Sequence, residues 1–232
     1  MKVIILKNLK DVGKTASSLI RKEIKNKPNL VLGLAAGASV IPLYKNLISE
    51  YKKRNINFSK VRTFNLDEYI ESQSLRNFMD RHLFSKINLK KENINFLDGN
   101  STNIQKMCRE YESKIKKLKI DLQVLGIGKN GHIGFNEPGS NFSSKTRKVM
   151  LSKTSSDNYK YALTMGIKTI MQAGKIILMA GGEKKANAIA RVIQGKITSK
   201  TPASFLKRHR NVLFIIDKAA ASKLKNSYKK FK

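Results

Sequence analysis

The segment Leu122-Gln-Val-Leu-Gly-Ile-Gly-Lys-Asn-Gly-His-Ile-Gly-Phe-Asn-Glu-Pro138 decides how the fold of this chain is interpreted. Its first four residues are mostly apolar, which predicts a buried strand, and glycines at 126, 128, 131 and 134 punctuate the loop that follows. The loop carries His132, with Asn130 and Glu137 close in sequence. A histidine oriented by a carboxylate and an amide indicates proton transfer, although a histidine that only satisfies backbone groups of a turn would give the same pattern.

Outward from this segment, apolar runs of strand length alternate with stretches of helical period. Strands are predicted at residues 3–6, 30–34, 61–66, 122–125, 176–179 and 212–216, and helices at 16–24, 40–51, 104–118, 186–193 and 219–228. This alternation favours a Rossmann-like, doubly wound α/β fold, with a mostly parallel sheet and helices on both faces. We expect a single domain over residues 1–232. Such sheets bind ligands beyond the carboxyl ends of their strands, so the site residues should follow strands.

A second strand end, Leu34-Ala-Ala-Gly-Ala-Ser39, joins a predicted strand to a predicted helix. Gly37 and Ala38 would let backbone N–H groups approach a phosphate at the start of that helix. Ser39 could donate to the phosphate or cap the helix. Tight strand–helix turns use small residues in any case, so this pattern alone leaves both interpretations open.

A third strand end, Thr63-Phe-Asn-Leu-Asp-Glu-Tyr69, places Asp67 and Glu68 just past an apolar strand. A carboxylate there is a candidate general base if partial burial raises its pKa toward the working pH. A pair of solvated loop acids is the alternative. Acidic residues are scarce in this chain, and aromatic residues flank the pair.

Dinucleotide and metal sites fit the sequence less well. The glycines at 126, 128 and 131 match a dinucleotide-binding fingerprint, but Pro138 follows quickly and basic residues occupy the position where an acid is expected. The three histidines, His82, His132 and His209, are widely separated, and one cysteine cannot anchor zinc. No metal site is predicted.

The charge of the chain is strongly positive. There are 47 Lys and Arg against 16 Asp and Glu, a formal net charge of +31, and such a surface attracts nucleic acid. The cations are scattered through nearly every segment, however, and none of the usual nucleic-acid-binding motifs occurs. We therefore do not expect a nucleic-acid partner, and the positive field would equally attract small anions.

The remaining composition predicts a cytoplasmic protein that does not enter a membrane. The single cysteine, Cys108, allows no disulfide within the chain and lies in a helical pattern typical of core residues. The N-terminal apolar run is too short for a signal peptide, and no stretch approaches the ~18 apolar residues of a membrane span.

Five segments in this order resemble the glucosamine-6-phosphate deaminase/isomerase family over essentially the whole chain. They are Phe64-Asn-Leu-Asp-Glu-Tyr69, the glycine-rich run Gly126–Pro138, Tyr161-Ala-Leu-Thr-Met-Gly166, Gly182-x-x-Lys185-Ala and Pro202-Ala-Ser204. The related 6-phosphogluconolactonases share the fold, but the long run around His132 is more similar to the deaminases.

The resemblance implies a reaction and a set of site residues. The family converts glucosamine 6-phosphate and water into fructose 6-phosphate and ammonia, without a cofactor or metal. Asp67 matches the general base, His132 the ring-opening residue and Glu137 the acid that orients it. Asn130 stands where many members have Asp, so a hydrogen-bonding role is implied there. The phosphate-binding elements match Gly37, Ala38, Ser39 and Lys185.

Three departures from the family pattern affect these expectations. Ala36 replaces a hydroxyl residue of the phosphate turn, and a shortened lid at about 151–160 lacks the family's phosphate-binding Arg. We expect Lys153 or Lys160 to substitute for that Arg as a point charge. Finally, two allosteric positions of the family are kept as Ser140 and Arg147, but two others are apolar, as Val149 and Met150, so strong allosteric activation is not expected.

Two other readings stay open at this point. The chain could be a related isomerase, deaminase or lactonase that acts on another sugar phosphate, or a non-catalytic sugar-phosphate-binding protein on the same scaffold. Retention of Asp67, His132 and Glu137 favours the enzyme. The resemblance is compatible with a homo-oligomer.

Overall fold

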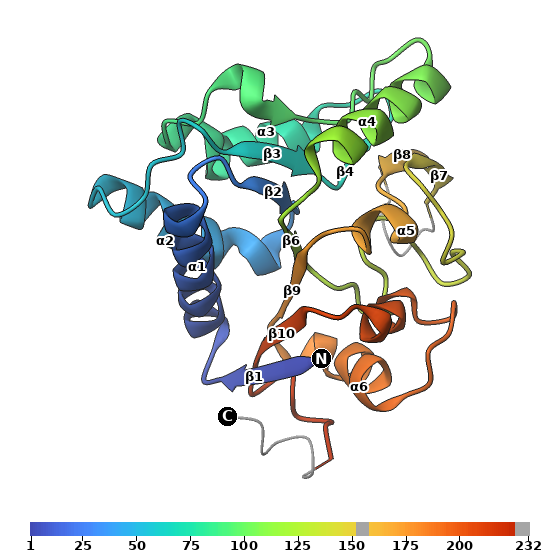
Figure 1. Ribbon diagram of the computed structural model, residues 1–232. Helices are drawn as coiled ribbons and strands as arrows, with labels where there is room; N and C mark the ends of the chain where they lie inside the picture. The colour runs from blue at the N-terminus through green and yellow to red at the C-terminus, as the bar shows by residue number, and fades with distance from the viewer. Residues whose placement is uncertain (152–157, 226–232) are drawn as a thin grey trace.

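The computed structural model describes residues 1–151 and 158–225, and it is built on a seven-stranded, fully parallel sheet (Figure 1). The strand order is β1-β10-β9-β6-β2-β3-β5. The bounds are β1 (Lys2–Leu6), β2 (Val31–Leu34), β3 (Arg62–Asn65), β5 (Ile94–Asn95), β6 (Leu122–Leu125), β9 (Lys175–Ala180) and β10 (Val212–Asp217). Every residue of the central strands β2 and β6 is buried, as expected for a sheet covered on both faces.

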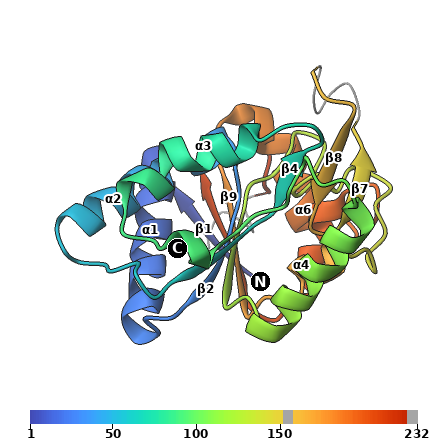
Figure 2. The ribbon, with the colours of Figure 1, turned by 90° about the horizontal axis from the view of Figure 1, so that it is seen from above.

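Helices lie on both sides of this sheet (Figure 2). One side carries α1 (Leu9–Asn26), α2 (Ile41–Lys52) and α3 (Ser74–His82), and the other carries α4 (Ile104–Leu118) and α6 (Ala186–Gln194). A short helix, α5 (Ile167–Ile170), follows β8. The prediction of a doubly wound α/β fold is confirmed.

Close packing of α1 on α2 depends on a glycine. A Cβ atom on Gly13 would lie 2.6 Å from atoms of Pro42, which is closer than Cβ atoms approach other atoms in proteins. The side chain of Asn8 caps α1 by accepting a hydrogen bond from the backbone N–H of Asp11. Gly13 thus allows α1 to pack closely on α2, and Asn8 stabilises the first turn of α1.

The chain changes direction across the sheet between β2 and β6, which are neighbours. From β2 it runs outward through β3 to β5, and from β6 it runs the opposite way through β9 to β10. The loops after β2 and β6 therefore diverge at this point and leave a crevice beyond the strand ends, where doubly wound folds bind ligands.

A second, three-stranded sheet stands beside the first. It consists of β4 (Asp67–Tyr69), β8 (Tyr161–Thr164) and β7 (Arg147–Met150), all antiparallel, with Asp67 paired to Thr164. The β7–β8 hairpin borders the region where a shortened lid is predicted. Of that region, residues 152–157 lie outside the described residues, so the shortened lid stays a prediction.

The helix predicted at 219–228 is wrong over the part that the structure describes. Residues 218–223 form successive turns after β10, although Ala220, Ala221 and Leu224 are buried as their spacing suggested. The Asp217 carboxylate accepts hydrogen bonds from the backbone N–H groups of Ala220 and Gly182, which ties the chain back to the loop after β9. The apolar spacing therefore reflects buried turns, and residues 226–228 lie outside the described part.

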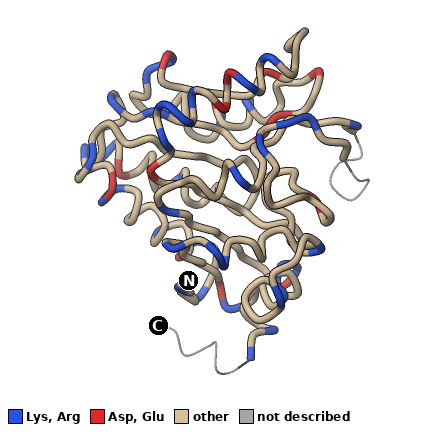
Figure 3. The backbone as a smooth tube through the Cα atoms, turned by 45° about the vertical axis from the view of Figure 1, so that its right-hand side comes forward, with Lys and Arg blue, Asp and Glu red and all other residues tan. Residues whose placement is uncertain are grey.

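The charge is spread over the molecule, as the sequence suggested. Lys and Arg occur along all parts of the backbone trace, and acidic residues are sparse (Figure 3). None of the helices within the described ranges has the length and apolarity that a membrane crossing requires.

Candidate active site

Most of the predicted site residues line one cavity of about 1090 Å³ beyond the ends of β2, β3, β6 and β9, which we call the strand-end cavity. Its lining includes Gly37, Ala38, Ser39, Asp67, Asn130, His132 and Lys185. Glu137 is not among the lining residues, but it contacts two residues that are, His132 and Asn130. The cavity lies at the switch point of the strand order, so the topology explains why these distant segments meet.

Asp67 is the only acid among the described residues that line the strand-end cavity. It is buried, and no described residue donates a hydrogen bond to its carboxylate. Burial, and secondarily the neighbouring Glu68 carboxylate, raises the pKa of Asp67 to about 7. Asp67 can therefore exchange a proton near neutral pH, which suits a general base.

Three tyrosines form the apolar surroundings of this carboxylate. Burial raises the pKa of Tyr44, Tyr69 and Tyr111, and the charge of Asp67 raises each of them further. The hydroxyls of Tyr44 and Tyr111 donate to the backbone carbonyls of Ala35 and Asn65, so neither is directed at Asp67. These tyrosines therefore make the environment of Asp67 less polar, and the hydroxyls of Tyr44 and Tyr111 donate no hydrogen bond to its carboxylate.

Glu68, the other acid of the same strand end, has a structural role. Its carboxylate accepts hydrogen bonds from the backbone N–H groups of Tyr69, Leu75 and Arg76, at 2.8–3.1 Å. These bonds join β4 to the first turn of α3. The alternation of side chains along β4 thus separates a reactive acid from a structural one.

His132 is held by the two neighbours that the sequence singled out. Its Nδ1 lies 3.0 Å from Oε1 of Glu137, and its backbone N–H donates to the side-chain oxygen of Asn130 at 3.1 Å. The side-chain amide of Asn130 donates to the other oxygen of Glu137 at 2.7 Å. Nδ1 of His132 and Oε1 of Glu137 are close, but their geometry is not that of a hydrogen bond. The triad orients the imidazole toward the cavity.

Two glycines of the loop leave room for these groups. A Cβ atom on Gly128 would lie 2.3–2.5 Å from the ring atoms of His132, so the imidazole packs directly against this backbone. Gly134 has a φ of 55° and passes close to Asp67 and to the Thr164 hydroxyl. That hydroxyl accepts from the N–H of Phe135 at 3.0 Å, which fixes the loop to β8.

The predicted phosphate-binding residues all line the strand-end cavity. Gly37, with a φ of 130°, adopts a conformation that glycine favours, and Ala38–Val40 form a 3-10 turn that leads into α2. Of the two alternatives for Ser39, the helix cap is not formed, because Val40 occupies the N-cap position of α2 and no side chain caps it. Ser39 is therefore left to face the cavity. Lys185 lies at the start of α6.

Two cations of the strand-end cavity were not singled out by the sequence. Lys129 and Arg191 both line it, and the Arg191 guanidinium donates to the backbone carbonyl of Lys129 at 3.2 Å. The position of Lys129 beside Asn130 in the glycine-rich loop was an available signal. Arg191 lies inside α6 and carries no sequence signal, because only the fold directs it to this cavity.

Of the two lysines predicted to replace the family's Arg in the lid, only Lys160 lies within the described residues. Lys153 lies outside the described residues, and the ammonium of Lys160 sits 5.5 Å from the ring centre of Tyr161. Lys160 is not among the described residues that line the strand-end cavity, and a lysine in place of the family's Arg stays a prediction. Arg147 and Ser140 do meet, at 3.5 Å, and Arg147 also donates to the side-chain oxygen of Asn136 at 2.9 Å.

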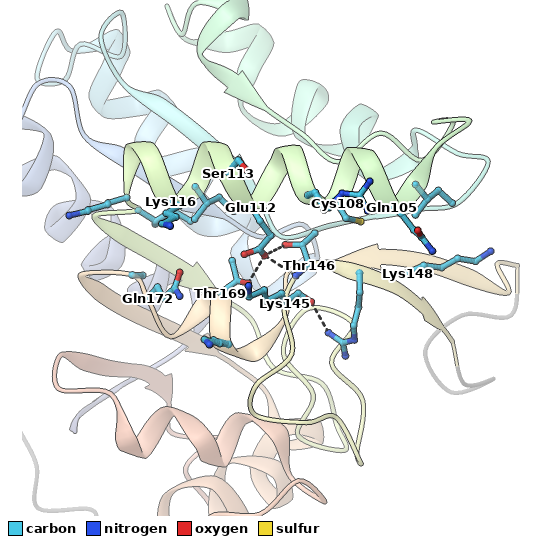
Figure 4. Close-up of a pocket in the computed structure, with 18 residues that line it drawn as sticks. Gln105, Cys108, Glu112, Ser113, Lys116, Lys145, Thr146, Lys148, Thr169 and Gln172 are labelled. Carbon is cyan, nitrogen blue, oxygen red and sulfur yellow. Dashed lines mark hydrogen bonds between the residues drawn. The ribbon is translucent and has the colours of Figure 1, made fainter.

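A second cavity of about 1040 Å³, which we call the α4 groove, lies between α4, the segment around β7 and α5 (Figure 4). Seven of its lining residues are cations, and its only described acid is Glu112. Oε1 of Glu112 accepts three hydrogen bonds, from the backbone N–H and hydroxyl of Thr146 and from the hydroxyl of Thr169. All of these bonds join structural elements, so the acid of this groove is already satisfied.

Cys108 and the histidines add no further site. Cys108 is buried, with 7% exposure, and burial raises the pKa of its thiol, so the prediction of a core residue is confirmed. His209 bonds to the backbone, through Nε2 to the carbonyl of Ala173. Within the described ranges no group of three or more His, Cys, Asp or Glu is arranged to hold a metal ion.

Comparison with known proteins identifies the family. A family model described as glucosamine-6-phosphate isomerases/6-phosphogluconolactonase matches residues 7–215. The glucosamine-6-phosphate deaminase of Clostridium acetobutylicum is 47% identical over 241 residues, which cover 97% of this chain and 100% of the relative. That of Thermoanaerobacter sp. X514 is also 47% identical, over 96% of this chain and 94% of its own.

Comparison with solved structures supports the same family. A monomeric glucosamine-6-phosphate deaminase superposes with a TM-score of 0.92 at 36% identity, covering 96% of this chain and 99% of its own. The 6-phosphogluconolactonase of Thermotoga maritima, at 20% identity and a TM-score of 0.78 over 94% of this chain and 99% of its own, shares the fold alone. The chain therefore belongs to the glucosamine-6-phosphate isomerase/6-phosphogluconolactonase family, and within it to the glucosamine-6-phosphate deaminases.

Proposed function

We propose that this chain converts glucosamine 6-phosphate and water into fructose 6-phosphate and ammonia, with Asp67 as the base that moves the substrate's C2 proton. The observation that carries this proposal is Asp67 itself, a buried acid with a pKa near 7 and no described donor, in the same cavity as a carboxylate-held histidine. A binding module has no evident use for such an acid, since leaving it without donors costs stability.

Ring opening is assigned to His132. The imidazole would carry a proton from the C1 hydroxyl of the sugar to the ring oxygen, which releases the open-chain aldehyde. Glu137 and Asn130 hold the ring in place for this transfer, since both contact it or its backbone. A positioned acid/base of this kind contributes about 10²–10⁴-fold in rate.

Isomerisation is assigned to Asp67. The carboxylate removes the proton from C2 and returns it to C1, so the amine-bearing carbon becomes an imine. Addition of water to this imine expels ammonia and leaves the ketone of fructose 6-phosphate. Each step moves a proton or adds water, and no electron is gained or lost overall.

Binding of the phosphate is assigned to the turn of Gly37, Ala38 and Ser39 and to Lys185. These residues line the same strand-end cavity as Asp67. Backbone N–H groups at a helix start, a hydroxyl and an ammonium are all suitable donors to phosphate oxygens. We also propose a cytoplasmic location, which suits a small metabolite as substrate and a single buried thiol.

An ammonia-release assay tests the proposal. Wild-type protein should release ammonia and fructose 6-phosphate in equal amounts from glucosamine 6-phosphate, and Asp67→Asn should not. Hydrolysis of 6-phosphogluconolactone by the same preparation, measured in parallel, reports the related activity. Lactone hydrolysis without ammonia release would overturn the assignment in favour of a lactonase.

A further inference from the structure

Three cations gather at the end of the strand-end cavity between the loop after β6 and α6. They are Lys129, Lys185 and Arg191, and none of them forms an ion pair with a described residue. Burial lowers the pKa of Lys185, and the charge of Lys129 lowers it further, so these two ammonium groups lie close enough to repel each other. The cluster has positive charge without a partner inside the protein.

The cations approach from two directions. Lys129 follows β6, whereas Lys185 is the N-cap residue of α6 and Arg191 lies six residues further along that helix. Side chains of a helix tilt toward its N-terminus, so Arg191 extends back toward the start of α6. Its hydrogen bond to the Lys129 carbonyl fixes the guanidinium against the loop. Lys129 and Arg191 are exposed and Lys185 is half-buried, so the three cations reach the cavity from its solvent-facing rim.

We propose that Lys129 and Arg191 act with Lys185 as a three-cation clamp for the phosphate of the substrate, and that they determine its preference for phosphorylated over free sugars. The inference deepens the proposed function and rests on it. A phosphate monoester is a dianion near neutral pH, and it would relieve the mutual repulsion of the three cations. Arg also offers paired N–H donors that match two phosphate oxygens.

The clamp would also orient the substrate within the cavity. Its cations line the same cavity as the phosphate turn at Gly37–Ser39, whereas Asp67 has no cation paired with it and keeps a raised pKa. A phosphate held at the cationic end therefore leaves the sugar carbons for Asp67 and His132. No arginine occurs between residues 151 and 160, so the clamp supplies a guanidinium that this region does not contain.

Substitutions at Arg191 can separate the effect of its charge from that of its hydrogen-bond donors. Arg191→Gln keeps a donor for the Lys129 carbonyl but removes the charge, and Arg191→Lys keeps the charge but loses the paired donors. Lys129→Ala removes the second cation. Lys184→Ala is the matched control, because Lys184 is exposed, adjacent to Lys185 and not part of the cavity lining.

The measurements are KM and kcat for glucosamine 6-phosphate and, by calorimetry, the binding of glucitol 6-phosphate, inorganic phosphate and glucitol. Arg191→Gln and Lys129→Ala should each raise KM and weaken both phosphate ligands by about 5- to 30-fold, a range set by the loss of one charged hydrogen bond. Arg191→Lys should retain most of the affinity, and kcat should change by less than about threefold in all variants. Lys184→Ala should match the wild type, and melting temperatures should stay unchanged.

Two results would overturn the clamp. One is phosphate affinity in Arg191→Gln and Lys129→Ala that equals that of Lys184→Ala, and the other is a loss in kcat rather than KM, which would make Arg191 a brace for the His132 loop. Calorimetry keeps this test apart from that of the reaction. If glucitol 6-phosphate binds the wild type far better than it binds Arg191→Gln and Lys129→Ala, but no ammonia is released, the clamp stands and the deaminase assignment fails.

Discussion

The strand-end cavity and the α4 groove are nearly equal in volume, at about 1090 and 1040 Å³, and each has a single acid among its described lining residues. The groove has more cations, seven against three. The two acids differ in their partners, since Glu112 accepts three hydrogen bonds and Asp67 accepts none from a described residue. In a chain of net charge +31, the number of cations does not show which cavity is catalytic, whereas an acid left without donors does.

Exchanging each acid for its amide is the strongest test of this contrast. Asp67→Asn should lower kcat for ammonia release by about 10³-fold or more, because the base is lost. Glu112→Gln should leave kcat unchanged and lower the free energy of unfolding by about 1–3 kcal/mol, since it weakens charged hydrogen bonds. Steady-state kinetics and urea unfolding of both variants measure this. A large loss of kcat in Glu112→Gln would erase the distinction between the cavities.

The pH dependence of the rate sharpens the same contrast. Asp67 must be ionised to accept the C2 proton, and its pKa is raised to about 7. The rate should therefore fall about tenfold per pH unit below that value and level off above it. Glu112→Gln should show the same profile, because Glu112 takes no part. A kcat/KM profile that is flat between pH 5 and 7 would contradict the role of Asp67.

A side chain on Gly128 should disturb the histidine without touching either acid. The methyl group of Gly128→Ala would overlap the His132 ring at 2.3–2.5 Å, so the imidazole must move away from its position beside Glu137. We expect kcat to fall about 10- to 100-fold, as misplaced acid/base groups usually cost. Gly126→Ala is the matched control, since nothing lies within 4 Å of a Cβ there. Equal rates in the two variants would show that the ring position is not critical.

The smallest expected effect concerns stability. The folded protein holds a proton on Asp67 up to pH about 7, whereas the unfolded chain releases it near pH ~4, so stability attributable to this group falls as pH rises between these values. Asp67→Asn should thus be more stable than the wild type above pH 7, by on the order of 2–4 kcal/mol. The difference should shrink toward pH 4. Urea unfolding at pH 5 and pH 8 measures it, and equal stability at pH 8 would mean that the buried charge costs nothing.

Much of the fold and the catalytic end could be predicted from the sequence. The helix α4 and six of the seven strands of the main sheet were located within about two residues, and α1 was found although it begins seven residues before its predicted start. The weakly patterned elements were not, including α3, which buries only Met79, and β4, which has three residues. Segments that depend on tertiary pairing, such as β7 and β8, carry little local signal.

Local sequence also identifies only some of the site residues. Asp67, His132 and Glu137 stand in distinctive motifs and could be found from their neighbours in the chain. Arg191 could not, because its relevance comes from the way α6 packs beside the loop after β6. The turns after β10 were mistaken for a helix because burial of Ala220, Ala221 and Leu224 mimics helical spacing. The spacing of apolar residues thus predicts which residues are buried. It does not predict which distant segments of the chain meet at one site.

The strand-end cavity is built from loops that follow several different strands, and this affects how its substrate selectivity could be re-engineered. Its walls follow four different strands, β2, β3, β6 and β9, each anchored in the main sheet by its own parallel neighbours. A loop grafted after one strand would leave the other three walls on their original supports. Substrate preference could therefore be changed one wall at a time, by exchanging the phosphate turn or the start of α6 while the segment that carries His132 stays intact.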